Sequence, residues 1–297
     1  MDFTTSAGKW AWLHQHKPQE LSGAKHWLTM TDFALATWSG TPFMSATLAP
    51  RTGCFDIFSR SWLPELLQQS QSPPLPKLIE AGGTIGSMRN GCLTAAGAAD
   101  ANTLLVAGGH DHPIAASAVR RILKNARIDS MGTANATYGE TAILKPDQNT
   151  QGLYVTLPIS GAKGAAVIGM TEFSVTLGQH VNDVGALYKS LLDIHKAADI
   201  PTNIRNTLEA MAHKTKSYWS AMTNSGVPPA PIYAMGGWAR CPALMQLRAN
   251  VFGEVITVVD EPEMVALGAA LFAAQGAGSS PTFSAANHSH VVEPNSN

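Results

Sequence analysis

The chain has 297 residues, a formal net charge of −1, 45% hydrophobic residues and only 14% charged residues. A chain of this length can bury one large core or two modest ones, and its low, balanced charge predicts neither a nucleic-acid surface nor a polybasic membrane patch. The longest apolar run, residues 265–274, is too short to span a bilayer, and residues 1–13 lack the pattern of a signal peptide. Together with three widely spaced cysteines, these features indicate a soluble cytoplasmic protein that binds neither nucleic acid nor membrane.

The first hundred or so residues show the spacing of helices first and of strands later. We expect three helices in this part of the chain. The first contains residues 9–13 and ends before Lys17-Pro18, the second spans about 21–38, and the third starts within residues 62–67. Glycines then punctuate a strand region over residues 82–97. Five of the seven tryptophans lie before residue 63, and we expect them to fill a core, with stacking of one of them on a sugar ring as the alternative.

Residues 104–122 predict a strand, a loop and a helix that carry a carboxylate. Residues 104–107 form an apolar run typical of a buried strand, and Gly108-Gly109 break it before His110-Asp111-His112. Pro113 suits the first helical position, and apolar residues follow at helical spacing as far as Ile122. Open α/β sheets place their chemistry at the carboxyl ends of strands, on loops that open helices. Asp111 is therefore the first candidate for a catalytic group.

A second loop contains Gly132-Thr133, which follow residues 128–131 and precede the small and polar residues 134–137. Glycine exposes backbone N–H groups to an anion, and the threonine hydroxyl adds a donor. Such pairs are usually ordinary turns, so this loop indicates a phosphate site only in the context of the rest of the chain.

The last half of the chain repeats the alternation of strands and helices. We expect strands within 152–169, at 232–235 and at 255–259, and helices over 183–198, over 203–220 and from Pro242 to just before Gly253. Gly236-Gly237 form a turn, and Asp260 with Glu263 has capping-box spacing at the start of a helix that runs to Gln275. Residues 278–297 are rich in Ser, Thr, Asn and Pro, which predicts a disordered tail.

Several of these segments together resemble the FGGY carbohydrate kinases, the family of glycerol kinase, xylulokinase and ribulokinase. Residues 235–274 resemble the carboxyl-terminal nucleotide-binding segment of that family, and residues 7–18 resemble its Lys-x-x-Trp-Leu signature. The helix at 26–40, the Gly-Gly-His-Asp loop at 108–111 and the Met-Gly-Thr-Ala-Asn loop at 131–135 resemble further family motifs. The motifs occur in family order, which is more specific than any one of them.

The resemblance implies an α/β chain with a ribonuclease H-like fold of the actin/hexokinase ATPase type, in two lobes. Residues 1–120 would be the remnant of the amino-terminal sugar-side lobe and 121–277 the carboxyl-terminal nucleotide-binding lobe, with the tail at 278–297. It also implies a carbohydrate kinase that uses ATP and Mg²⁺. The implied roles are these: Asp111 is the catalytic base and, with His110, contacts the substrate; Gly132 and Thr133 hold the terminal phosphates; Gly236, Gly237 and Cys241 contact adenosine.

The sequence also departs from the family pattern, because no Asp-x-Gly-Thr loop precedes Lys9. We therefore expect an incomplete amino-terminal lobe, in a truncated or split kinase that acts as a homodimer or with a missing amino-terminal fragment. Two alternatives remain open. One is a catalytically incomplete chain that binds nucleotide or acts only with a partner. The other is a metal-dependent hydrolase built on His110-Asp111-His112, with His14 and His16, although no metal ligand set is assigned.

Overall fold

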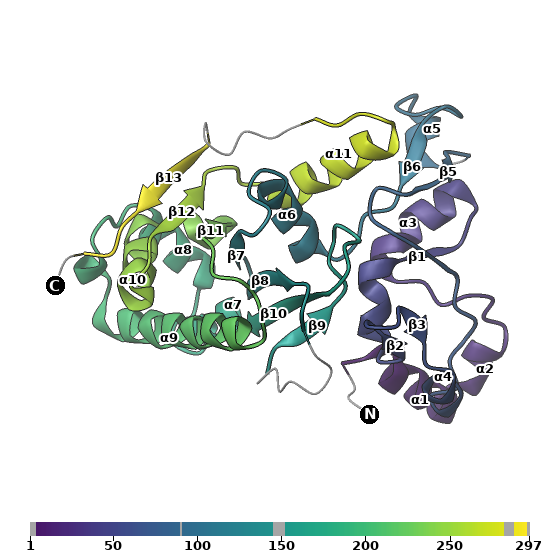
Figure 1. The fold of residues 1–297 in the computed structure, drawn as a ribbon, viewed down its shortest axis with the longest axis horizontal. Helices are drawn as coiled ribbons and strands as arrows, with labels where there is room; N and C mark the ends of the chain where they lie inside the picture. Colours follow the sequence, from purple (N-terminus) through teal and green to yellow (C-terminus); the bar gives the residue numbers. More distant parts are fainter. Residues whose placement is uncertain (1–3, 90, 145–151, 282–287, 296–297) are drawn as a thin grey trace. The chain divides into compact units, whose positions relative to one another are not determined.

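The computed structural model describes residues 4–89, 91–144, 152–281 and 288–295. The chain divides into two compact units, drawn in Figure 1 with colours that follow the sequence. The first unit contains Met1–Ile114, Thr156–Ala165 and Ala269–Pro281, and the second contains Ala115–Val155, Ala166–Gly268 and Thr282–Asn297. The expected boundary at residue 120 therefore lies six residues beyond the observed one, and two later segments return to the first unit. Within the described residues, no helix combines the length and the apolar character needed to cross a membrane.

The first unit consists of short helices and three two-stranded ladders. Its helices are α1 (Ser6–His16), α2 (Pro18–Ser22), α3 (Met30–Ser39), the 3₁₀ helix η1 (Ala46–Thr52), α4 (Pro64–Gln69) and α5 (Cys92–Ala95). In the first ladder, β1 (Phe43–Ser45) and β4 (Lys77–Ile79) are parallel. The other two ladders are antiparallel: β2 (Phe55–Asp56) pairs with β3 (Ser61–Trp62), and β5 (Thr84–Ser87) pairs with β6 (Leu104–Val106).

The prediction of one helix over residues 21–38 is wrong in its first half. α2 ends at Ser22, and the chain leaves helical conformation until α3 begins at Met30. Trp27 lies in this break and still packs edge-on against Trp10, with ring centroids 5.7 Å apart, so it belongs to the apolar pattern without being helical. Periodicity alone cannot distinguish an apolar residue in a helix from one in a connecting segment.

The tryptophans divide between the core and the surface. Trp10 is fully buried, as expected, whereas Trp12 is 51% exposed and stacks on His16. The expectation that the early tryptophans fill a core is therefore wrong for Trp12.

The second unit is built on one seven-stranded sheet with the order β13-β12-β11-β7-β8-β10-β9. Its strands are β7 (Arg127–Met131), β8 (Asn135–Thr141), β9 (Tyr154–Thr156), β10 (Ala165–Thr171), β11 (Ile232–Met235), β12 (Ile256–Val259) and β13 (Ser289–Val292). Its helices are α7 (Phe173–Gly178), α8 (Val184–Leu192), η2 (Ala197–Asp199), α9 (Thr202–Asn224), η3 (Gly237–Arg240) and α10 (Pro242–Phe252). Two further helices, α6 (Asp111–Arg120) and α11 (Met264–Gly276), each contain one of the points where the chain passes between the units.

Strands β11 and β12 and helices α9 and α10 match the sequence prediction closely, whereas the helix expected over residues 183–198 ends at Leu192 and strand β8 was not predicted. β7 pairs in parallel with β11, which pairs in parallel with β12, whereas β7 and β8 form an antiparallel hairpin. Helix α10 begins with Pro242 and ends at Gly253, whose φ of 68° is favourable for glycine. One hydrophobic core lies between this sheet and α9 and α10, with fully buried residues such as Leu208 and Leu244.

The prediction of a disordered tail is wrong for residues 289–292. These residues form β13, which pairs antiparallel with β12 at the edge of the sheet. Polar composition conceals such a strand, because an edge strand needs only backbone hydrogen bonds and few buried side chains. Two side chains of α10 also contact this tail: Gln246 donates to Glu293 O at 2.8 Å, and Asn250 accepts from Asn295 N at 2.8 Å. Of the other tail residues that were predicted to be disordered, 282–287 and 296–297 lie outside the described part.

The predicted capping box at Asp260 is also wrong. Helix α11 begins at Met264, the Glu263 amide donates to the Glu261 carboxylate at 3.1 Å, and Asp260 Oδ1 instead lies 2.9 Å from His290 Nδ1. The strand pairing of β13 supplies this competing partner for Asp260, which spacing along the sequence cannot reveal.

Candidate active site

Asp111 lies at the first residue of α6, five residues beyond the end of β6. The expectation of a buried strand before it is wrong, because β6 pairs antiparallel with β5 alone and Leu104 is 45% exposed. Pro113 is the third residue of the helix rather than the first. The predicted position of Asp111 at the start of a helix is nevertheless observed. The N–H groups and the dipole of a helix N-terminus favour a carboxylate there.

The loop that presents Asp111 is held by a close backbone approach. A Cβ atom on Gly109 would lie 2.5 Å from Thr47 Oγ1 and 3.2 Å from Ile159 Cδ1, so only glycine fits. The same Thr47 hydroxyl accepts a hydrogen bond from His110 N at 3.1 Å, and Thr47 O accepts one from Thr156 Oγ1 at 3.2 Å. Thr47 is 3% exposed, so a buried hydroxyl fixes the backbone directly before the catalytic candidate.

The side chains of His110 and Asp111 differ in exposure. His110 is 17% exposed, with Nδ1 3.4 Å from Asp111 Oδ1, whereas the Asp111 side chain is 64% exposed. Burial lowers the pKa of His110 to about 4, which Arg51 and His112 reinforce and Asp111 opposes. Burial likewise lowers the pKa of His112, whose backbone N–H donates to Asp111 Oδ1 at 2.8 Å. At neutral pH the carboxylate therefore stands at the surface beside a neutral imidazole.

The Gly132-Thr133 loop is the turn of the β7–β8 hairpin in the second unit. Gly132 N donates to Ala134 O at 2.9 Å and Thr133 O accepts from Ser174 N at 2.9 Å, so both groups are already used within the protein. Thr133 is exposed. Within the described residues, its backbone N–H and hydroxyl have no hydrogen-bond partner, so these are the two donors that this turn can offer to an anion.

The Gly236-Gly237 turn lies directly against this hairpin. Gly236 has a φ of 96°, and a Cβ atom there would lie 2.6 Å from Met131 O, the residue before Gly132. Gly237 opens η3 and is exposed, and its carbonyl accepts a hydrogen bond from the Tyr188 hydroxyl at 3.3 Å. The two glycine loops that were predicted separately are therefore neighbours in space.

Cys241 follows η3 but lies in the core. Its side chain is 0% exposed, and burial raises the pKa of its thiol to about 12. In this arrangement the thiol is neutral and faces protein rather than solvent.

A buried ion pair that the sequence analysis missed lies next to the hairpin. Arg248 in α10 donates to Asp129 Oδ2 in β7 from Nε at 3.0 Å and from Nη2 at 2.6 Å, and both side chains are 0% exposed. Asn135, the first residue after the turn, donates to Asp129 Oδ1 at 2.6 Å and accepts from Thr215 Oγ1 at 2.9 Å. A weak signal was present, because Asp129 is a charged residue in a short strand, β7, that is buried at four of its five positions. The network ties both strands of the hairpin to α9 and α10.

The predicted site residues thus form two groups. His110 and Asp111 lie together in the first unit, with Thr47 and Arg51, whereas the two glycine loops and Cys241 belong to the second unit. Over the described ranges, no three His, Cys, Asp or Glu side chains are grouped so that they could hold a metal ion. His110-Asp111-His112 therefore does not join His14 and His16 in a metal site.

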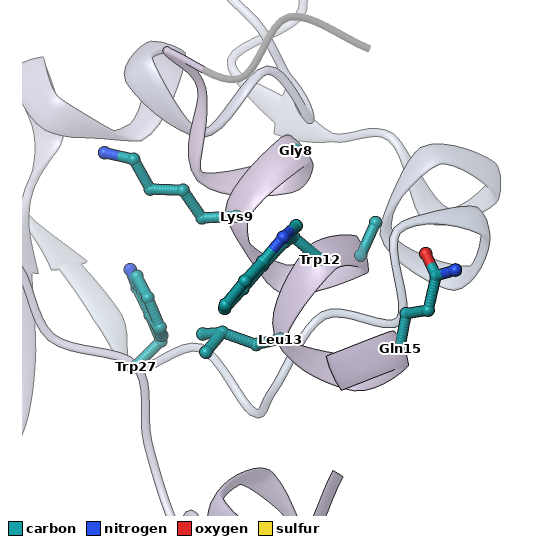
Figure 2. A pocket seen from close by; sticks show the side chains of 7 residues that line it. Gly8, Lys9, Trp12, Leu13, Gln15 and Trp27 are labelled. Carbon is teal, nitrogen blue, oxygen red and sulfur yellow. The ribbon is translucent and has the colours of Figure 1, made fainter. Parts of the chain in front are cut away.

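The first unit also contains a cleft on α1. Its volume is about 570 Å³, and Figure 2 shows Lys9, Trp12 and Leu13 projecting from the helix toward Trp27. The cleft is lined by none of the predicted site residues.

Two domain families match the chain in order. Residues 1–118 match the N-terminal domain of the FGGY family of carbohydrate kinases, and residues 179–277 match its C-terminal domain. A ribulokinase from Vibrio parahaemolyticus is 34% identical over 94 residues, which cover 31% of this chain and 17% of that protein. A xylulose kinase from Streptomyces coelicolor is 23% identical over 304 residues, which cover 91% of this chain and 60% of that protein. The chain thus spans less than two thirds of either relative.

A solved structure shares the fold. The glycerol kinase of Plasmodium falciparum, crystallised with ADP, superposes with a TM-score of 0.74 at 16% identity, over 97% of this chain and 67% of that one. The match confirms the predicted fold of the actin/hexokinase ATPase type.

Proposed function

Because the chain belongs to the FGGY family of carbohydrate kinases, we propose that it catalyses ATP-dependent phosphorylation of a sugar or polyol hydroxyl, with Asp111 as the general base. The placement of Asp111 carries this proposal. Its carboxylate is exposed at the start of α6, on a loop that Gly109 and Thr47 fix, so it can approach a hydroxyl without rearrangement of the backbone.

The chemistry requires one proton transfer and one phosphoryl transfer. The sugar oxygen bonds to the γ-phosphorus as the bond from that phosphorus to the β,γ-bridging oxygen breaks, and the hydroxyl proton passes to Asp111. His110 lies beside the carboxylate and is neutral, so it adds no competing positive charge where the hydroxyl approaches Asp111. We therefore assign both His110 and Asp111 to the proposed sugar site.

The second unit supplies the groups that suit a nucleotide. Thr133 offers a hydroxyl and a backbone N–H at an exposed turn, and Gly236 brings a second turn against it where any Cβ would collide with backbone. Backbone donors at such turns bind phosphate oxygens, and Gly132 contributes by leaving space rather than by its N–H. Gly237 is exposed at the start of η3, where adenosine would lie in the proposed complex.

Mg²⁺ accompanies ATP in this reaction class, where it neutralises charge on the phosphates. The side chains in the described ranges contain no cluster that fits a protein-held metal. Mg²⁺ commonly keeps several waters and binds through substrate phosphates. We therefore assign it no protein ligand and treat Mg²⁺-ATP as the form that binds. A cytoplasmic location is part of this proposal, because ATP is the proposed substrate and because the three cysteines, Cys54, Cys92 and Cys241, are free thiols, as in a reducing compartment.

The test is ADP release by the purified chain with Mg²⁺-ATP and a panel of ketopentoses, ketohexoses and polyols. Sugar-dependent release is expected, and Asp111→Asn should abolish it while nucleotide affinity stays nearly unchanged, because the amide cannot accept the proton. Equal rates in the two proteins would remove Asp111 from the mechanism.

The same panel addresses the alternative of a chain that binds nucleotide without transferring phosphate. Nucleotide binding by a folded protein that releases no ADP with any sugar would contradict the proposal and favour that alternative.

A further inference from the structure

Arg51 is a charged residue in contact with the Asp111 loop. It lies in η1, the same short helix that contributes Thr47, and its Nη2 is 3.3 Å from His110 Nε2. One element therefore holds the loop twice, through the backbone of His110 at Thr47 Oγ1 and through its ring at Arg51.

The contact with Arg51 determines which ring nitrogen of His110 carries a proton. A guanidinium group has only donors, so a hydrogen bond from Nη2 requires Nε2 to be unprotonated. The proton of the neutral ring must then be on Nδ1. A doubly protonated ring would direct an N–H toward the Arg51 cation, which both burial and charge oppose.

The other side of the ring faces the carboxylate. His110 Nδ1 is 3.4 Å from Asp111 Oδ1, and within the described residues this buried nitrogen makes no hydrogen bond. Asp111 Oδ1 already accepts the His112 N–H at 2.8 Å, whereas Oδ2 accepts no hydrogen bond from any described residue. The two carboxylate oxygens thus have different environments, one facing donors of the loop and one facing solvent.

We propose that Arg51 is a positioning residue that keeps His110 neutral with its proton on Nδ1, so that Nδ1–H faces Asp111 Oδ1 and Oδ2 is left to accept the hydroxyl proton. The placement of the His110 proton is independent of the reaction, whereas its effect on catalysis rests on the proposed kinase function. The charged and titratable groups that face His110 are Arg51, Asp111 and His112. Of these, Arg51 alone touches Nε2.

The first test is nitrogen NMR of the full chain labelled with ¹⁵N-histidine, with the His110 signals assigned by their loss in His110→Asn. The wild-type ring should show a protonated Nδ1 and an unprotonated Nε2 at neutral pH. Arg51→Met removes the donor and the charge at similar length, so the share of the Nε2–H tautomer and the pKa of His110 should both rise.

The control is Arg89→Met, which removes an exposed arginine of the same unit that has no side-chain hydrogen bond to the described residues. It should leave the His110 signals unchanged. A wild-type ring with its proton on Nε2, or an unchanged tautomer in Arg51→Met with a native melting temperature, would overturn the assignment.

The second test is kinetic and separates this inference from the proposed function. With the sugar that the wild type phosphorylates, Arg51→Met should lower kcat about tenfold or more with little change in KM for ATP, and Arg51→Lys should recover part of it. Unchanged kcat in Arg51→Met would refute the positioning role. A wild type that releases no ADP would refute the proposed function, and the NMR result would still decide where the His110 proton lies.

Discussion

Replacement of Arg248 by Met tests the network behind the phosphate-loop hairpin. Met removes both hydrogen bonds to Asp129 Oδ2, at 2.6 and 3.0 Å, and leaves a carboxylate that is 0% exposed with only the Asn135 amide. Removal of one partner of a buried ion pair costs roughly 3–5 kcal/mol, because the remaining charge stays desolvated. For a chain of this size, that cost corresponds to a fall in Tm of roughly 10 °C. Urea denaturation of both proteins measures the difference in the free energy of unfolding.

A double-mutant cycle distinguishes this account from simple loss of packing. Asp129→Leu combined with Arg248→Met removes both charges at similar volume, and Asn135 Nδ2 keeps its contact with Ser130 O at 3.3 Å. The double variant should therefore be less destabilised than Arg248→Met alone. If the losses of unfolding free energy in Asp129→Leu and in Arg248→Met simply added in the double variant, the reasoning would be refuted. As a surface control, Arg205→Met removes a pair with Glu209 at 3.9 Å and should cost at most about 1 kcal/mol.

Three further predictions concern the two loops. Thr133→Ala should weaken ATP binding roughly two- to tenfold by loss of a phosphate hydrogen bond while KM for the sugar is unchanged; calorimetric titration measures this, and equal affinities would argue against the phosphate role. Gly109→Ala should cost roughly 1–3 kcal/mol, because Cβ would lie 2.5 Å from Thr47 Oγ1, and an unchanged urea midpoint would contradict this clash. The pKa of His110 is lowered from 6.5 to about 4 in the folded chain, so the unfolded chain binds the extra proton first and stability falls as pH drops through that window. The contribution of His110 to this slope approaches about 1.4 kcal/mol per pH unit, and His110→Asn should remove that contribution while the contribution of His112 remains. The same slope in both proteins would contradict the shift.

The sequence predicted best the elements whose signals are local. Pro242 and Gly253 mark the two ends of α10, and the apolar run before Gly236 marks β11, because start and stop residues act within a few positions of the backbone that they constrain. The carboxylate at a helix start was found for the same reason, although its strand was misread. The break between α2 and α3 was missed because Trp27 belongs to the apolar pattern but not to the helix.

The contacts that build the site are of long range, and no local pattern contains them. Arg248 and Asp129 are 119 positions apart, and Arg51 and His110 are 59 apart. The edge strand β13 escaped prediction because its stability comes from pairing with β12 and not from its own composition. In each case a partner distant in sequence determines the conformation, and a single sequence records only one of the two residues as unusual.

The two groups of site residues rest on separate buried contacts, so the proposed sugar site and the proposed nucleotide site can be perturbed one at a time. Thr47 and Gly109 fix the Asp111 loop entirely within the first unit, whereas Asp129 and Arg248 fix the hairpin entirely within the second. Phosphoryl transfer depends largely on positioning and electrostatic stabilisation, so each network should control one substrate. Thr47→Val should therefore lower kcat with the sugar while the Kd for ATP is kept, and Arg248→Met should raise the Kd for ATP. If both variants changed both quantities equally, the two loops could not be treated as independently organised sites.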